Sequence, residues 1–261
     1  MDKYTHLQLR EVFHVEFLRW LGRKVKAEHY ALKGGVNLRF FFKSFRYSED
    51  MDLDVRIIRV ADLTEIVMKI LNAAAFQGNL KPFGIAAVVP PNIGKAKQTE
   101  TTQRFKIHLI SSSGDDLFTK IEFSRRGLAG KVITGAIDDA ISRSYKLAPL
   151  FIAHYDAQSA IEQKISALAG RSVVQARDIF DLHLLSSQYH TGSDERKLGI
   201  KPGILTKAYE RVFEVEFEQF RDTVVSYLSA DDQPVYDNPG AWEDIRLKTA
   251  NFIEEVRKSY A

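Results

Sequence analysis

Strand-like alternation of apolar and polar residues is confined to the first half of this chain. Four segments alternate in this way and are rich in β-branched residues, and two of them flank a Ser-Ser-Gly-Asp-Asp turn. These predicted strands are Leu53–Val60, Phe83–Val89, Arg104–Ser111 and Leu117–Ser124. Beyond about Gly135 we find only helical spacing. The chain is therefore predicted to be α+β and bilobal, with a mixed-sheet lobe over residues 1–135 and an all-helical lobe over residues 136–261.

Helical periodicity predicts the remaining elements. A short Gly-interrupted segment, Ala31–Phe41, indicates a turn that enters a helix, whereas the polar stretch Pro90–Thr102 indicates a loop. Apolar residues recur at three-to-four spacing in the other segments. These predicted helices are Thr5–Arg23, Asp62–Phe76, Asp156–Leu168, Gln175–Ser186, Pro202–Leu228 with a break, and Trp242–Lys258.

Composition excludes several classes of protein. The chain has no cysteine, which excludes disulfides and thiolate zinc sites, and no apolar run approaches the roughly 20 residues of a membrane span. Residues 1–10 lack the pattern of a signal peptide, so we expect a cytoplasmic protein that does not bind membranes. The first 150 residues hold 24 Lys/Arg against 16 Asp/Glu, a basic excess that suits a polyanionic substrate.

The motif with most chemical content begins at Gly34-Gly35 and continues about a dozen residues later with Asp50-Met51-Asp52-Leu53. Two glycines let the backbone approach a phosphate closely. On a strand, Asp50 and Asp52 would share one face while the apolar residues between them face the core. Two carboxylates on one face suit a hard cation, so we expect Asp50 and Asp52 to hold Mg²⁺ or Mn²⁺.

Gly-Gly, a spacer and then Asp-apolar-Asp-apolar is the signature of polymerase-beta-like nucleotidyltransferases. The finer pattern resembles one branch, the AbiEii toxins of type IV toxin–antitoxin systems, which include the MenT toxins. Three stretches carry the resemblance, and the last of them also includes Arg171. They are Lys33–Leu38, Arg46–Leu53 and Glu162–Leu182.

The resemblance implies a bilobal enzyme that moves a nucleotide from an NTP onto an acceptor with release of pyrophosphate. Some relatives are thought to extend the 3′ end of tRNA, so an RNA acceptor, most simply tRNA, is expected here. The resemblance also implies a cognate antitoxin, which would be a separate chain.

Candidate site residues follow from the motifs and from the resemblance. Glu122 shares a strand face with Lys120 and is the candidate third carboxylate, although an exposed Lys/Glu face needs no function. Asp178 matches the family pattern, yet acids in a first helical turn are also favoured by the helix dipole. Candidate catalytic residues are Asp50, Asp52, Glu122, Lys164 and Asp178; candidate nucleotide- or phosphate-binding residues are Lys33, Gly34, Gly35, Arg46, Ser48 and Arg171.

Three other functions remain open at this point. A related transferase could modify a protein or a small molecule instead of RNA. A phosphotransferase could use the same metal site to move a γ-phosphoryl group. A non-enzymatic nucleotide- or RNA-binding module is the third, although the intact pair of like charges argues against it.

Overall fold

A computed structural model describes residues 4–189 and 198–259. The chain forms two compact units. Unit 1 comprises Met1–Lys43 and Tyr47–Tyr155, and unit 2 comprises Ser44–Arg46 and Asp156–Ala261.

Unit 1 is built on a mixed sheet of seven strands. In order across the sheet they are β3 (Ile85–Val89), β4 (Thr102–Ser111), β5 (Asp116–Ser124), β2 (Met51–Val55), β1 (Tyr30–Lys33), β7 (Phe151–Tyr155) and β6 (Val132–Ala136). The β2–β5 and β1–β7 pairs are parallel, and the other neighbouring pairs are antiparallel. The parallel β2–β5 pair places two segments about seventy residues apart in the chain side by side.

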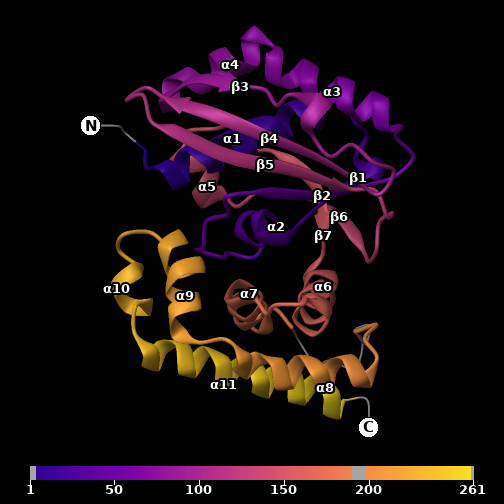
Figure 1. Ribbon diagram of the computed structural model, residues 1–261, viewed down its shortest axis with the longest axis vertical. Coiled ribbons are helices and arrows are strands. Elements are labelled where there is room, and N and C mark those ends of the chain that lie inside the picture. Colours follow the sequence, from indigo (N-terminus) through magenta and orange to yellow (C-terminus); the bar gives the residue numbers. More distant parts are fainter. Residues whose placement is uncertain (1–3, 190–197, 260–261) are drawn as a thin grey trace. The chain divides into compact units, whose positions relative to one another are not determined.

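The core of unit 1 lies between one face of this sheet and its helices. Phe105, Ile121 and Leu53 are fully buried, and each is flanked on its strand by residues that face the other way. Helices α3 and α4 lie together along one side of the sheet (Figure 1), and both contact α1. The helices of unit 1 are α1 (His6–Leu21), α2 (Gly34–Phe41), α3 (Val60–Asn72), α4 (Ala74–Leu80) and α5 (Asp139–Ser144), with three-residue turns of 3₁₀ helix at Ala27–His29, Lys81–Phe83 and Ile93–Lys95.

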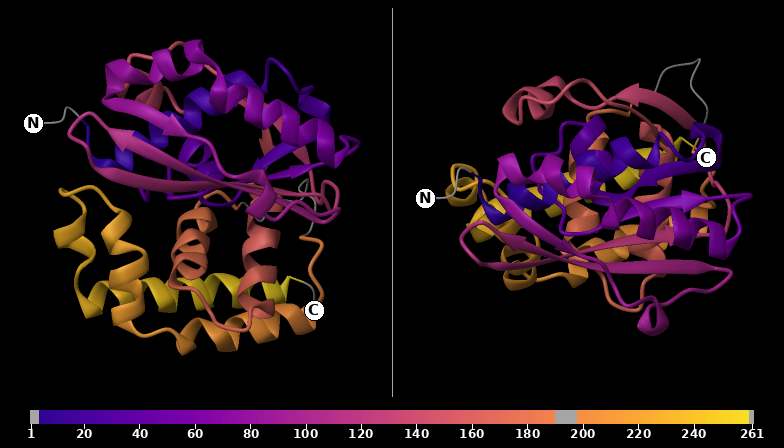
Figure 2. Two further views of the ribbon diagram at one scale, coloured as in Figure 1. Left: turned by 45° about the horizontal axis from the view of Figure 1, so that its top comes forward. Right: turned by 90° about the horizontal axis from the view of Figure 1, so that it is seen from above.

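Unit 2 is helical, as the sequence predicts. Its helices are α6 (Ala157–Gly170), α7 (Ala176–Ser186), α8 (Pro202–Arg211), α9 (Phe217–Thr223), α10 (Gln233–Tyr236) and α11 (Pro239–Lys258), with 3₁₀ turns at Val212–Glu214 and Val225–Tyr227. Figures 1 and 2 show α6 and α7 side by side, with α8 and α11 running past them. Phe180, Phe220 and Trp242 form the aromatic centre of this unit, where the last two rings stack at 4.3 Å.

The mixed-sheet α+β architecture is confirmed, but three details of the prediction are wrong. Strands do continue beyond Gly135, because β7 lies between β1 and β6 and is buried on both faces, which removes its alternation. The strand predicted to reach Val60 ends at Val55. The helix predicted over Asp62–Phe76 is interrupted at Ala73, whose backbone is extended, so α3 and α4 are separate helices.

Among the described residues, no helix is both long enough and apolar enough to cross a membrane.

Candidate active site

The acidic face of β2 is the centre of the candidate site in unit 1. Met51 and Leu53 are fully buried, whereas Asp52 points to the opposite face and is half-buried. Asp50 lies just before the strand, and its Oδ2 is 2.8 Å from Lys120 Nζ on β5. Asp54 continues the same alternation and is only 5% exposed. The predicted division of β2 between core and acidic face is therefore confirmed.

The strand register aligns four charged residues in a row across the sheet. Asp52 on β2 pairs with Glu122 on β5, and Glu122 pairs in turn with Arg104 on β4. On the other side, Asp52 pairs with Lys33 on β1. Register partners project from the same face about 5 Å apart, so two carboxylates lie at the centre of this row with a cation at each end.

Each neighbour of Asp52 has its own counter-charge. Glu122 Oε2 lies 2.7 Å from Arg104 NH2, and Asp54 accepts hydrogen bonds from Lys33 Nζ (2.5 Å) and from the Tyr155 hydroxyl (2.7 Å). Burial, reinforced by the bond to Asp54, raises the pKa of the Tyr155 hydroxyl, which therefore stays protonated as a donor. Lys33 thus contacts a carboxylate in this structure.

Asp52 carries the least compensated charge in the row. Burial raises the pKa of its carboxyl, and the nearby carboxylates of Glu122 and Asp50 raise it further, while Lys33 and Lys120 oppose the shift. A carboxylate in this environment is stabilised by an additional cation.

Gly34 provides the close approach that the Gly-Gly motif requires. Its φ of +68° is in the left-handed region, and a Cβ atom at this position would lie 3.0 Å from Asp52 Oδ2. Any side chain would therefore compete with the carboxylate for space. Lys33 is the N-cap of α2, and Gly35 is its second residue.

Ser48 and Arg46 have different surroundings. The Ser48 hydroxyl donates a 2.8 Å hydrogen bond to the backbone carbonyl of Asp50, which shapes the entry into β2. Arg46 belongs to unit 2, is 5% exposed, and binds both carboxylate oxygens of Asp181 at 3.0 Å through NH2. In this structure the Arg46 guanidinium is part of a buried ion pair.

Unit 2 holds a second charged cluster on α6 and α7. Lys164 Nζ lies 2.9 Å from Asp178 Oδ1 and 2.6 Å from Asp181 Oδ2, and both carboxylates are buried. Burial alone would lower the pKa of Lys164, but these two carboxylates raise it above its usual value. Burial likewise opposes ionisation of Asp181, but Arg46 and Lys164 hold its pKa below the usual value.

Arg171 completes this cluster at its more exposed side. Its Nε lies 2.7 Å from Asp178 Oδ2, and 43% of its side chain is exposed. The cluster therefore combines three cations with two carboxylates, which leaves one excess positive charge on residues that are fixed by their partners.

The residues of the acidic face were tested as a divalent-metal site. Within residues 4–189 and 198–259, no group of three or more His, Asp or Glu side chains is close enough to form a complete metal cage. The donor set nevertheless fits Mg²⁺ or Mn²⁺, which takes one or two carboxylates and completes its shell with phosphate oxygens and water. Lys120 and Arg104 already bind Asp50 and Glu122, which indicates that this face accommodates positive charge.

Several residues of the two clusters were absent from the sequence prediction. Asp54 shares strand parity with Asp52, so its position on the acidic face could have been inferred. Arg104 and Lys120 become neighbours of the acids only through the β4–β5–β2 register. Tyr155 lies on β7, a strand that the sequence did not reveal, and nothing in its local pattern pointed to Asp54.

Comparison with known proteins places this geometry in context. The family described as "Nucleotidyl transferase AbiEii toxin, Type IV TA system" matches residues 16–257. Among curated proteins, no sequence matches the chain. The fold is similar to that of MenT4, a nucleotidyltransferase toxin from Mycobacterium tuberculosis H37Rv, with a TM-score of 0.61 and 18% identity over 96% of this chain and 84% of that one.

Two further solved structures share the fold. One is a protein from H. pylori, with a TM-score of 0.55 and 15% identity over 98% of this chain and 96% of that one. The other is JHP933 from Helicobacter pylori, with a TM-score of 0.54 and 16% identity over 98% and 94%.

These findings define the chain as a nucleotidyltransferase. More narrowly, it belongs to the AbiEii family of nucleotidyltransferase toxins of type IV toxin–antitoxin systems, which confirms the resemblance found in its motifs.

Proposed function

We propose that this toxin transfers a nucleotide from an NTP to the 3′ end of an RNA acceptor, tRNA in the simplest case, with Mg²⁺ or Mn²⁺ bound by Asp50 and Asp52. The observation that carries the proposal is the register of Asp52 with Glu122, beside Asp50 on the same face. This arrangement supports Glu122 as the third carboxylate. The proposal rests on these residues together with the family of the chain.

The reaction forms one bond and breaks one. The acceptor hydroxyl oxygen bonds to the α-phosphorus of the NTP, the bond from this phosphorus to the bridging oxygen breaks, and pyrophosphate leaves. The hydroxyl proton passes to solvent. A bound divalent ion would supply charge that polarises the phosphate oxygens and favours ionisation of the acceptor hydroxyl.

The residues of unit 1 position the reactants. Gly34 leaves room for a phosphate beside Asp52, since it has no side chain there. Gly35 and Lys33 provide a backbone amide at the start of α2 and a nearby ammonium group. Ser48 fixes the backbone at Asp50, and its hydroxyl oxygen remains an acceptor for a further hydrogen bond.

The residues of unit 2 provide positive charge for the triphosphate. We assign this role to Lys164 and Arg171, with Asp178 holding both cations in place. The Arg46–Asp181 pair positions the Lys164 ammonium group through the shared Asp181 carboxylate. A phosphate-binding role for Arg46 itself would require it to leave this pair.

The biological setting goes with this proposal. A toxin of this family would act in the cytoplasm, where NTPs and tRNA are available, and a cognate antitoxin encoded as a separate chain would restrain it.

The decisive experiment is incubation of the full chain with Mg²⁺, total tRNA and each α-³²P-labelled NTP in turn. Wild-type protein is expected to label the tRNA 3′ end and to release pyrophosphate. Asp50→Asn should fold normally and transfer nothing, whereas Asp62→Asn, which changes an exposed aspartate on α3, should behave as wild type.

Three outcomes would contradict the proposal. Label on protein in place of RNA would indicate a protein acceptor. Transfer of a γ-³²P label with release of NDP would indicate a phosphotransferase. Equal tRNA labelling by folded Asp50→Asn would remove Asp50 from the catalytic site.

A further inference from the structure

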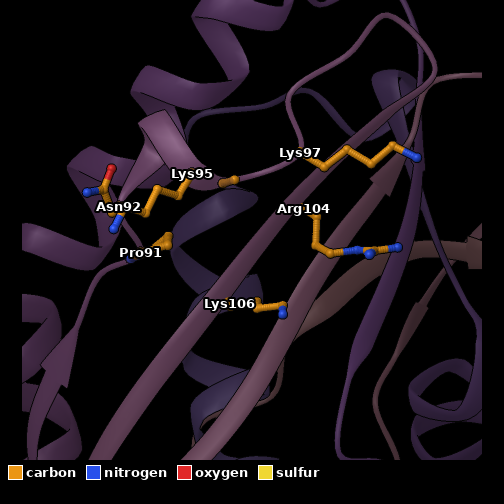
Figure 3. Close-up of a pocket in the computed structure, with 7 residues that line it drawn as sticks. Pro91, Asn92, Lys95, Lys97, Arg104 and Lys106 are labelled. Atoms are coloured by element: carbon orange, nitrogen blue, oxygen red, sulfur yellow. The ribbon is translucent and has the colours of Figure 1, made fainter.

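A basic pocket lies in unit 1 between β4 and the polar loop that precedes it. Its volume is about 360 Å³, and its charged lining consists of Lys95 and Lys97 from the loop with Arg104 and Lys106 from β4 (Figure 3). Of the described residues, none that lines the pocket is acidic or aromatic. A concave surface with this lining attracts phosphate groups and offers no platform for a base.

The loop is tied to the sheet by hydrogen bonds. The Arg104 backbone amide donates to the Lys97 carbonyl at 2.8 Å, and the Thr99 amide donates to the Thr102 carbonyl at 2.9 Å. The Gln103 side chain donates to Gln98 at 2.9 Å. These bonds fix the position of Lys97 beside β4, and in Figure 3 the side chains of Lys97 and Arg104 extend in the same direction.

The three lysines of the pocket hold unneutralised charge. Lys95, Lys97 and Lys106 are exposed, and none forms an ion pair with any carboxylate of residues 4–189 and 198–259. Like charges held around one cavity repel each other, so binding of an anion there relieves this repulsion.

The pocket adjoins the acidic face through Arg104. This residue lines the pocket and also binds Glu122, the register partner of Asp52. Two strand spacings separate β4 from β2, which places the pocket side of the sheet about 10 Å from the acids. A polyanion seated in the pocket can therefore extend to the reaction centre.

The same strand face continues beyond the pocket to an aromatic pair. His108 lies two residues after Lys106, and its ring stacks on that of Phe118 at 4.8 Å. Phe118 is 59% exposed. Lysines next to an exposed aromatic ring are the combination by which proteins hold single-stranded nucleic acid, with phosphates on the cations and a base on the ring.

We propose that the pocket formed by Lys95, Lys97, Arg104 and Lys106 binds backbone phosphates of the acceptor RNA and directs its end toward Asp50 and Asp52. The inference builds on the proposed function, because the acceptor is taken to be RNA. The pocket charge is separate from the triphosphate-binding charge assigned to Lys164 and Arg171.

The test measures binding, without turnover. Fluorescein-labelled total tRNA is titrated with full-length wild type and with the triple variant Lys95→Gln/Lys97→Gln/Lys106→Gln, between 50 and 200 mM salt, conditions over which about 0.7–0.9 counterions are released per phosphate contact. Arg104 is kept because it binds Glu122. The triple variant should bind tRNA about tenfold or more weakly, with a salt slope smaller by about 2–3.

Two variants isolate the cause. The triple Lys→Arg variant should bind tRNA as wild type does, because it keeps the charges. Lys81→Gln changes an exposed lysine near the start of β3, which pairs with the far end of β4, and should leave the slope unchanged. Thermal unfolding midpoints are compared to show that every variant is folded.

Each result decides the matter. An unchanged tRNA affinity and salt slope in the folded triple Gln variant would overturn the inference. Loss of Mg²⁺-ATP binding with tRNA binding intact would assign the pocket to the triphosphate and overturn it as well. Pocket-dependent tRNA binding by a wild-type protein that labels no RNA would uphold the pocket and refute only the proposed function.

Discussion

Gly34 and Asp52 are packed so closely that a Cβ atom at position 34 would lie 3.0 Å from Asp52 Oδ2. Gly34 also has a φ of +68°. Two separate constraints, one conformational and one of space, therefore require glycine beside the acid that carries the least compensated charge.

Replacement of Gly34 by alanine should damage both stability and transfer. Alanine in the left-handed region costs about 1–2 kcal/mol, and its methyl group would displace the Asp52 carboxylate. Denaturant unfolding should show this loss, and nucleotidyl transfer should fall at least tenfold.

The matched control is Gly78→Ala on α4, where a Cβ atom would meet nothing within 4 Å. This variant should be as stable as wild type or more stable, by up to about 1 kcal/mol, since alanine favours helix. Equal behaviour of the two variants would show that the Gly34–Asp52 approach is unimportant.

Metal binding should depend on the row of carboxylates even without nucleotide. Calorimetric titration with Mn²⁺ is expected to give binding to wild type, none to Asp52→Asn, and weaker binding to Glu122→Gln. Asp62→Asn should bind as wild type does. Full Mn²⁺ affinity in Asp52→Asn would exclude this face as the metal site, whatever the effect on activity.

The sequence was sufficient for the acidic face of β2, because alternation along one strand is a local property. Met51 and Leu53 identify the buried side, so Asp52 has only the other side to occupy. Glu122 could be proposed from the same parity on β5. Its position opposite Asp52 is a matter of strand order, however, and a parallel pair between segments seventy residues apart leaves no local pattern.

Residues that become neighbours only on folding were beyond sequence reasoning. Arg46 lies two residues before Ser48 and was predicted to contact phosphate, yet the structure pairs it with Asp181 on α7. β7 and its Tyr155 were missed because a short strand buried on both faces does not alternate. The Tyr155–Asp54 hydrogen bond could not be predicted for the same reason.

The buried Arg46–Asp181 pair should be important for the stability of unit 2. Arg46→Gln and Asp181→Asn should each destabilise the protein by about 3–5 kcal/mol, because each leaves a buried charge without its partner. The double variant should lose less than the two single losses together. Denaturant unfolding of all four proteins measures the coupling.

An exposed ion pair of the same unit provides the comparison. Lys248 and Asp244 form an i,i+4 pair on α11 in which both side chains are 58% exposed. Lys248→Gln should change stability by less than about 1 kcal/mol. If Arg46→Gln proved equally mild yet abolished transfer, Arg46 would be a direct phosphate ligand.

His14 should make the protein sensitive to mild acid. The residue is buried on α1, where its ring shares a 2.9 Å hydrogen bond with the Thr119 hydroxyl, and Thr119 in turn donates to the backbone carbonyl of Glu49 just before Asp50. Burial lowers the pKa of His14 to about 3; the nearby Asp50 charge opposes this shift, and Arg10 adds to it.

The sign of the effect follows from the lowered pKa. The unfolded chain binds a proton at this histidine below about pH 6.5, whereas the folded protein does not until about pH 3, so acidification favours unfolding across this interval. From pH 7 to pH 5 His14 should cost about 2 kcal/mol of stability. His14→Gln, which keeps a donor for Thr119, should lose about that much less than wild type over the same interval. Parallel stability curves for the two metal-free proteins would mean that His14 is protonated in the folded state, and the buried chain from His14 through Thr119 to Glu49 would then need a charged member.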